Sequence, residues 1–189
     1  MPKQRNNIVM RSTRGMFGKQ VVFKRRGGIS YVSAPPEVDE NRVPTPKQLE
    51  VIQKFKTSVA YAAGAIKDPV TKEVYSSRAG RNQSAYNVAF RDAFTAPEVT
   101  GIIAQGYRGA PGDIIVAQAI DDFEVKSIRV SIHNAANELI EEGDAVMNIG
   151  FDRNWTYTAT QPNANVPGSK ITVTAMDLPG NKGALEIRL

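Results

Sequence analysis

The spacing of apolar residues changes once along the chain, near residue 98. Between residues 46 and 94, apolar side chains recur every three or four positions, which is the spacing of one face of a helix. From residue 98 onward they alternate with polar side chains, which is the spacing of a strand with one buried face. The pattern therefore predicts helices in the middle of the chain and strands in its C-terminal half.

Two helices are expected. The first begins at Thr45-Pro46, because Thr is a good N-cap and Pro suits the first helical position, and it ends at Asp68-Pro69. The second covers residues 84–94 and ends before Pro97. The first helix carries a single apolar stripe made of Leu49, Ile52, Phe55, Val59, Ala63 and Ile66.

Seven short strands are expected after residue 98, most of them separated by turns that contain Gly or Pro. Their predicted ranges are 99–105, 113–119, 125–133, 138–146, 154–160, 170–176 and 184–188. One buried and one polar face, repeated over seven strands, is typical of an antiparallel β-sandwich. The residues predicted to point inward include Ile128, Val130, Ile132, Trp155, Tyr157, Ala159, Ile171, Val173 and Ala175. Trp155, the only tryptophan, is expected near the centre of the core.

The N-terminal region contains a predicted hairpin. Two β-prone runs, 20–23 and 29–32, flank Arg-Arg-Gly-Gly, whose glycines suit a tight turn, and a proline-rich connector follows. We therefore expect three parts: a flexible basic arm (1–18), an α+β module of one hairpin and two helices (19–97), and an all-β immunoglobulin-like sandwich (98–189).

Two sequence resemblances support this division. The segments "AIDDFEVKSIRVSIHNAANELIEEGDA" and "WTYTATQPNANVPGSKITVTAMDLPGN" resemble the immunoglobulin-like and fibronectin-like β-sandwich modules of bacterial surface and secreted proteins. The segment "GMFGKQVVFKRRGGISYVSAPPEVDENRVPTPKQLEVIQKF" is similar to the start of uncharacterised Bacteroidota proteins, some phage-like or associated with contractile injection systems. The second resemblance implies a cargo or accessory protein of a phage-tail-like assembly, with a tube or tail component as its partner.

Charge is distributed unevenly along the chain. The net charge is +5, yet residues 1–30 carry +8 without any acid, whereas residues 111–189 carry −5. The basic residues of the first segment are Lys3, Arg5, Arg11, Arg14, Lys19, Lys24, Arg25 and Arg26. Such a segment is suited to dock on an acidic protein surface, which is the preferred hypothesis. Because Phe17, Phe23 and Tyr31 lie among the basic residues, binding of nucleic acid through phosphate contacts and base stacking is one alternative. A solvated basic tail without a partner is the other.

Carboxylates are the main candidates for chemistry in the C-terminal half. Asp121, Asp122 and Asp177 lie in predicted strand-end loops, which converge in a sandwich, and clustered carboxylate oxygens are the ligands that calcium prefers. However, "DLPGN" is also a good turn sequence, in which Asp accepts backbone N–H groups and Pro-Gly forms the corner. The turn is the preferred interpretation, and the calcium site remains an alternative. No other cofactor is expected.

Composition excludes several classes of site. The chain has no cysteine, which rules out disulfides, thiolate zinc sites and cysteine nucleophiles. His133 is the only histidine, is expected to be exposed at a strand end, and has no evident partner for zinc or for general-base chemistry. A non-enzymatic binding or structural protein is therefore the leading hypothesis. An adhesion or carbohydrate-binding module and a toxin effector are further alternatives.

The sequence also bears on location. No apolar run approaches the length of a membrane span, and the basic N-terminus lacks the apolar stretch of a signal peptide. We expect synthesis in the cytoplasm, followed by packaging into a virion-like or extracellular injection particle if the second resemblance holds. The sequence makes no prediction of oligomeric state.

Overall fold

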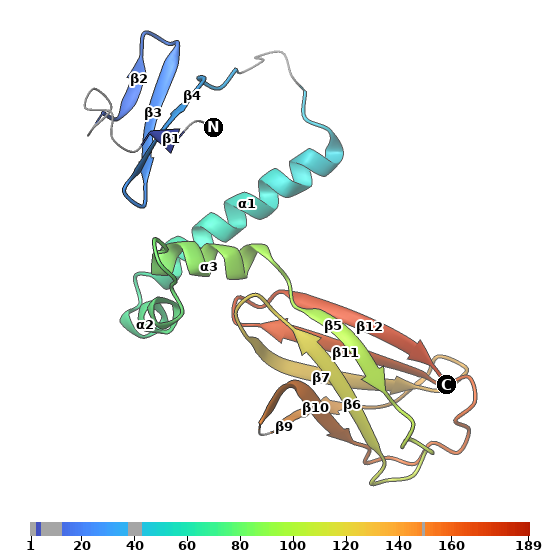
Figure 1. The fold of residues 1–189 in the computed structure, drawn as a ribbon. Helices are drawn as coiled ribbons and strands as arrows, with labels where there is room; N and C mark the ends of the chain where they lie inside the picture. Colours follow the sequence, from blue (N-terminus) through green and yellow to red (C-terminus); the bar gives the residue numbers. More distant parts are fainter. Residues whose placement is uncertain (1–2, 5–12, 38–42, 149) are drawn as a thin grey trace.

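The computed structural model describes residues 3–4, 13–37, 43–148 and 150–189, which form three four-stranded sheets and three helices. Figure 1 shows a small N-terminal sheet, a group of helices and a C-terminal β-sandwich following one another along the chain. The predicted class, an α+β region followed by an all-β sandwich, is confirmed. In the described part of the chain no helix is both long and apolar enough to cross a membrane.

The N-terminal sheet contains the expected hairpin and two further strands. Its strands are β1 (Lys3–Gln4), β2 (Gly15–Phe17), β3 (Val21–Arg26) and β4 (Ile29–Ser33), in the antiparallel order β1-β4-β3-β2. Gly27 and Gly28 both have positive φ in the β3–β4 turn, as the hairpin prediction required. The predicted basic arm includes β1 and β2, while residues 1–2 and 5–12 lie outside the described part of the chain.

Three helices follow: α1 (Pro46–Ala65), α2 (Pro69–Ser77) and α3 (Ala85–Phe94). Thr45 caps α1 as expected, in a reciprocal capping box with Gln48. The apolar pattern did not predict α2, although Asp68 caps this helix by accepting the Thr71 N–H at 2.9 Å. α1 ends at Ala65, shortly before the Asp-Pro pair that was predicted to end it, and that pair begins α2.

Only part of the predicted apolar stripe of α1 is covered. The C-terminal half of α1 packs against α3, where Ser58 and Ala62 are buried. Leu49, Ile52 and Phe55, in the N-terminal half, are each about half exposed. In Figure 1 this half of α1 extends away from α2 and α3.

The sandwich consists of two sheets with the strand orders β5-β6-β10-β9 and β12-β11-β7-β8. Its strands are β5 (Glu98–Ile103), β6 (Ile114–Ile120), β7 (Val125–His133), β8 (Leu139–Asp144), β9 (Val146–Asn148), β10 (Phe151–Thr158), β11 (Lys170–Asp177) and β12 (Lys182–Arg188). This order is that of an immunoglobulin-like sandwich, in which strands A, B, E and D face strands G, F, C and C′. The strand predicted for residues 138–146 is in fact two strands, because the chain crosses between the sheets at Ala145.

The core of the sandwich is the one that the alternating pattern predicted. All nine residues expected to point inward are buried, and Trp155 is 7% exposed. Val130 and Ile132 lie opposite Val173 and Ile171 in the β7–β11 register, so these side chains share one face of the sheet. Burial of each large apolar side chain contributes about 1.5–3 kcal/mol, which makes this core the main source of stability.

A second, smaller core joins the helices to one end of the sandwich. Ala62, Tyr75 and Ala89 of the helices pack with Phe123 from the β6–β7 turn and with Leu178 from the β11–β12 turn. The turns at this end of the sandwich therefore complete the interior of the helical layer. The candidate functional site lies at this junction.

Candidate functional site

Three carboxylates from distant parts of the chain meet where the helices contact the sandwich. Asp92 lies on α3, Asp121 in the β6–β7 turn and Asp177 at the end of β11, and one oxygen from each lies within 4.8 Å of one from the other two. Asp92 and Asp177 are 1% and 0% exposed, and Asp121 is half-buried. These three residues are called the aspartate cluster below.

Turn chemistry holds two members of the aspartate cluster in place. The Oδ2 atom of Asp121 accepts the backbone N–H groups of Phe123 at 2.8 Å and Glu124 at 2.9 Å. The Oδ1 atom of Asp177 accepts those of Gly180 at 2.8 Å and Asn181 at 2.6 Å. Both residues thus have the turn-forming role that the sequence analysis preferred, and both still face the cluster.

Asn181 connects the β11–β12 turn to the end of α3. Its side-chain amide donates to Asp177 Oδ2 at 2.7 Å, and also to the carbonyl oxygens of Asp92 at 3.4 Å and Ala93 at 3.3 Å. The last carbonyls of a helix have no partner within the helix, so a donor from elsewhere satisfies them. This contact fixes Asp177 relative to the helix that carries Asp92.

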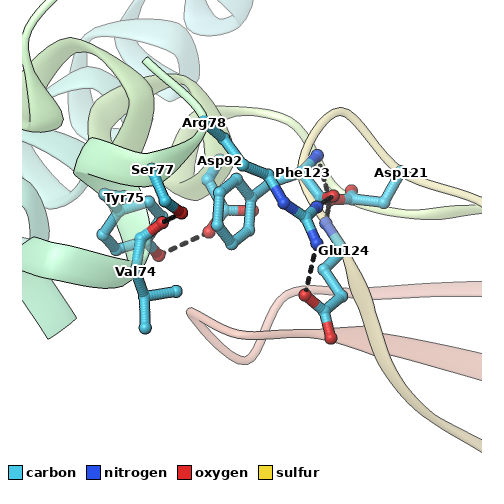
Figure 2. A network of polar contacts seen from close by, with 8 residues as sticks. All are labelled: Val74, Tyr75, Ser77, Arg78, Asp92, Asp121, Phe123 and Glu124. Atoms are coloured by element: carbon cyan, nitrogen blue, oxygen red, sulfur yellow. Dashed lines mark hydrogen bonds and ion pairs between the residues drawn. The ribbon is translucent and has the colours of Figure 1, made fainter. Parts of the chain in front are cut away.

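Asp92 lies at the end of a chain of phenols. The Tyr75 hydroxyl donates to Asp92 Oδ2 at 2.5 Å, and the Tyr61 and Tyr75 hydroxyls lie 2.9 Å apart (Figure 2 draws Tyr75 and Asp92). Burial raises the pKa of Asp92 to about 7, the Tyr75 hydrogen bond opposes this shift, and the charges of Asp121 and Asp177 add to it. Burial also raises the pKa of Asp177, against the hydrogen bonds that it accepts from the β11–β12 turn. The cluster therefore places several carboxylates in a buried environment, where each negative charge costs desolvation free energy.

Two oxygens of the cluster have no partner. Asp92 Oδ1 and Asp121 Oδ1 are both buried, and neither has a hydrogen-bond donor within the described residues. A proton on one of the two carboxyls would let them hydrogen-bond to each other, and this contact also raises the pKa of Asp92. None of the ion pairs found in that part of the chain involves any of the three carboxylates. Buried charges are normally paired, bound to a metal ion or neutralised by a proton. The arrangement can accordingly hold a metal ion or share a proton.

Arg78 lines the same two pockets as Asp92 and Asp121 but forms its ion pair with Glu124. The Arg78 guanidinium lies over the Phe123 ring, 4.5 Å from its centroid, and the Phe123 and Tyr75 ring centroids are 4.7 Å apart. Figure 2 draws the three side chains. Arg78 donates to the Phe123 carbonyl and pairs with Glu124 at 2.9 Å. Its charge is therefore neutralised outside the cluster.

The structure brings together two of the three predicted calcium ligands. Asp121 and Asp177 belong to the cluster, whereas Asp122 lies outside it and pairs with Arg91 at 3.1 Å. The third member, Asp92, was missed because it lies on a helix 29 positions before Asp121. The only indication in the sequence is that Asp92 is an acidic residue close to the small residues Ala89 and Ala93, and all three are buried on α3.

The predicted basic segment lies in the N-terminal sheet and its loops. Arg14, Lys19, Lys24, Arg25 and Arg26 are all exposed, Lys3 lies in β1, and Arg5 and Arg11 fall outside the described residues. Met16 and Phe17 of β2 are 55% and 74% exposed. No side chain described between residues 13 and 37 is buried. His133, expected to be exposed, is instead half-buried at the end of β7.

Comparison with known proteins gives no family for the chain. No protein-family model matches it, and no curated protein matches it. Solved structures that resemble part of the chain include CopC from Methylosinus trichosporium OB3b, at 15% identity and a TM-score of 0.36, over 48% of this chain and 87% of CopC. The Group B Streptococcus pullulanase SAP is similar at 13% identity and a TM-score of 0.32, over 45% of this chain and 10% of the pullulanase.

An engineered protein also matches, at 12% identity and a TM-score of 0.31, over 55% of this chain and 24% of its own length. These values are too low to transfer any property to the chain. The class that the structure itself defines is an immunoglobulin-like β-sandwich behind an α+β N-terminal region.

Proposed function

We propose that this is a non-enzymatic binding protein that docks on an acidic protein surface through its N-terminal sheet. The observation that carries the proposal is the absence of any buried side chain among described residues 13–37, although they include most of a four-stranded sheet. Sheets of this size gain stability by packing one face on another layer. A partner that covers the sheet would supply that layer.

The charge of the sheet favours an acidic partner. The hairpin residues Lys24, Arg25 and Arg26 are exposed, and no acid occurs in the first thirty residues to neutralise them. Opposite charge speeds association and favours one class of partner, while Phe17 and Met16 offer apolar surface for contact. The short edge strand β2 also leaves backbone groups on which a neighbouring sheet can be extended.

A narrower proposal is that the partner is a tube or tail component of a phage-tail-like contractile injection system, with this protein as cargo or accessory. The sequence resemblance of residues 15–55 supports that choice, and the sandwich then serves as the stable body of the packaged protein. Finding the captured partner to be a tube or tail protein would support the narrower proposal.

Charge reversal tests the docking surface. One variant carries Lys24→Glu, Arg25→Glu and Arg26→Glu, and a matched control carries Lys56→Glu, Lys67→Glu and Lys72→Glu, which are also exposed and lie on or beside α1 and α2. Proteins captured by the wild type and the control but not by the reversal variant are identified and purified. Their affinity is then measured by calorimetry.

The wild type should bind the purified partner at least about tenfold more tightly than the reversal variant. Binding should also weaken sharply between about 50 and about 500 mM salt, because surface charges are screened. Equal affinity for both variants, or affinity indifferent to salt, would contradict the proposal. A shift of random-sequence DNA or RNA that requires the three basic residues would show a nucleic-acid binder instead.

A further inference from the structure

We infer that the aspartate cluster is a binding site for a divalent cation of the oxygen-preferring class, with Asp92, Asp121 and Asp177 as its ligands. This inference is independent of the docking surface, because the cluster lies at the junction of the helices and the sandwich. It also extends the sequence hypothesis of a calcium site: Asp92 takes the place that Asp122 was expected to hold.

The spacing of the oxygens fits such an ion. Calcium binds oxygen atoms at 2.3–2.6 Å, so two ligands of one ion are at most about 5 Å apart. One oxygen from each carboxylate lies within 4.8 Å of the others, which places all three inside that limit. The donor set consists of oxygens alone, and this favours calcium or magnesium over softer metals.

The buried oxygens Asp92 Oδ1 and Asp121 Oδ1 support a bound ion independently of the spacing between the carboxylates. Asp92 is 1% exposed, and its Oδ2 is held by Tyr75, yet its Oδ1 has no partner among the described residues. Asp121 repeats this arrangement, with Oδ2 held by two backbone N–H groups and a buried Oδ1 left free. Asp92 and Asp121 are thus each oriented through one oxygen, and the other remains available to a cation. Both oxygens of Asp177 accept hydrogen bonds from Gly180 and Asn181, so Asp177 would bind a cation through a remaining lone pair.

The surroundings provide orientation and access. Tyr75 and Asn181 act as outer partners that fix Asp92 and Asp177, as hydrogen-bonded neighbours do around known metal ligands. A pocket of about 200 Å³ reaches Asp92, and another of about 310 Å³ reaches Asp121. Arg78 and Arg91 line these pockets, but Glu124 and Asp122 neutralise them, which lowers their repulsion of an incoming cation.

Calcium titration of the full-length protein after EDTA treatment tests the site. The wild type is compared with Asp121→Asn, which removes the most accessible ligand, and with Asp122→Asn, which removes the adjacent carboxylate outside the cluster. Excess calcium should raise Tm by about 5 °C or more in the wild type and in Asp122→Asn, because a ligand of the folded state stabilises it. The shift should be lost in Asp121→Asn.

Terbium, which replaces calcium at oxygen sites and emits when a nearby phenol is excited, gives a second readout. Tyr75 contacts Asp92 directly, so tyrosine excitation should produce terbium emission that calcium displaces. Tyr75→Phe keeps all three carboxylates and should lose most of that emission. Because Tyr75 also orients Asp92, the lost emission locates the ion only when calcium still raises the Tm of Tyr75→Phe.

Two results would overturn the inference. An equal calcium shift in the wild type and in Asp121→Asn would place the ion elsewhere on the acidic half of the chain. No calcium shift in the wild type, combined with a higher Tm for Asp121→Asn in EDTA, would show that Asp92 and Asp121 share a proton instead.

Discussion

At the scale of single residues, the most consequential contact is the hydrogen bond from Tyr75 to Asp92. Tyr75 is fully buried and serves both as donor to the carboxylate and as partner of Tyr61. Burial is the largest cause of the raised pKa of Tyr75, so this phenol stays protonated and continues to donate. Both hydroxyls are therefore part of the support of the aspartate cluster.

Tyr75→Phe should lower the free energy of unfolding by about 1–3 kcal/mol, because it leaves Asp92 Oδ2 buried without a donor. Urea unfolding followed by circular dichroism measures the change. Tyr86→Phe is the control, since Tyr86 packs against the same core and the structure shows no hydrogen bond from its hydroxyl within the described residues. Equal losses in the two variants would mean that packing, and not the hydrogen bond, is responsible.

A second residue-scale prediction concerns Gly183 in β12. A Cβ atom at this position would lie 1.8 Å from the Pro97 carbonyl oxygen, so the backbone at the start of β5 leaves no room for a side chain. Gly183→Ala should therefore destabilise the protein by about 1–3 kcal/mol through overpacking, measured by urea unfolding. An unchanged midpoint would show that β5 and β12 are not held this closely.

At the scale of elements, α1 is stabilised unevenly along its length. Its C-terminal half packs on α3, while Leu49, Val51 and Ile52 of its N-terminal half remain largely exposed. The exposed half depends more on its capping box and on helix propensity than on tertiary contacts. Substitutions in α1 that change helix propensity should therefore change the free energy of unfolding by a measurable amount.

Gly64→Ala should raise the free energy of unfolding by about 1 kcal/mol. Gly64 lies within α1, a Cβ atom there would meet nothing within 4 Å, and alanine has the higher helix propensity. The same urea experiment measures it, with Gly183→Ala as the contrasting glycine. A loss of stability would indicate that the last turn of α1 is not helical in solution.

Elements with a strong local pattern could be predicted, and those that depend on distant contacts could not. Alternation over residues 125–133 and 170–176 identified β7, β11 and the buried face around Val130 and Val173. The short helix α2 has only Tyr75 buried, so it lacks the apolar repeat by which a helix is recognised. The crossing between the sheets at Ala145 was not predicted, because only this one residue separates β8 from β9.

The candidate site was predictable only in part for the same reason. Asp121 and Asp177 were found because turn sequences mark strand ends, and strand ends converge in a sandwich. Asp92 joins them through the packing of α3 on those turns, which no local pattern encodes. Asp122 was included because it is adjacent to Asp121, but its side chain pairs with Arg91 instead.

At the scale of the whole molecule, the helices and the sandwich share a core, whereas the N-terminal sheet contributes no buried side chain in its described part. Phe123 and Leu178 lie inside the helical layer, so unfolding either part exposes apolar surface of the other. Cooperative unfolding is therefore expected for residues 43–189 as a unit.

Deleting residues 1–42 should leave Tm within about 2 °C of the full-length value, because little burial is lost. Differential scanning calorimetry measures both proteins, and a single transition is expected for the shortened chain. A fall of about 10 °C or more would show that the sheet stabilises the body and is not free for a partner.

The interior of the helical layer also has a consequence for synthesis. Translation proceeds from the N-terminus, so α1, α2 and α3 leave the ribosome before Phe123, Leu178 and Asn181 exist to fill and cap them. The Asn181 amide that holds the end of α3 arrives 88 positions after the Ala93 carbonyl that it binds. Until then the nascent helices expose apolar surface of the kind that chaperones recognise. A chain truncated before Leu178 and Asn181 would therefore keep its helical interior open.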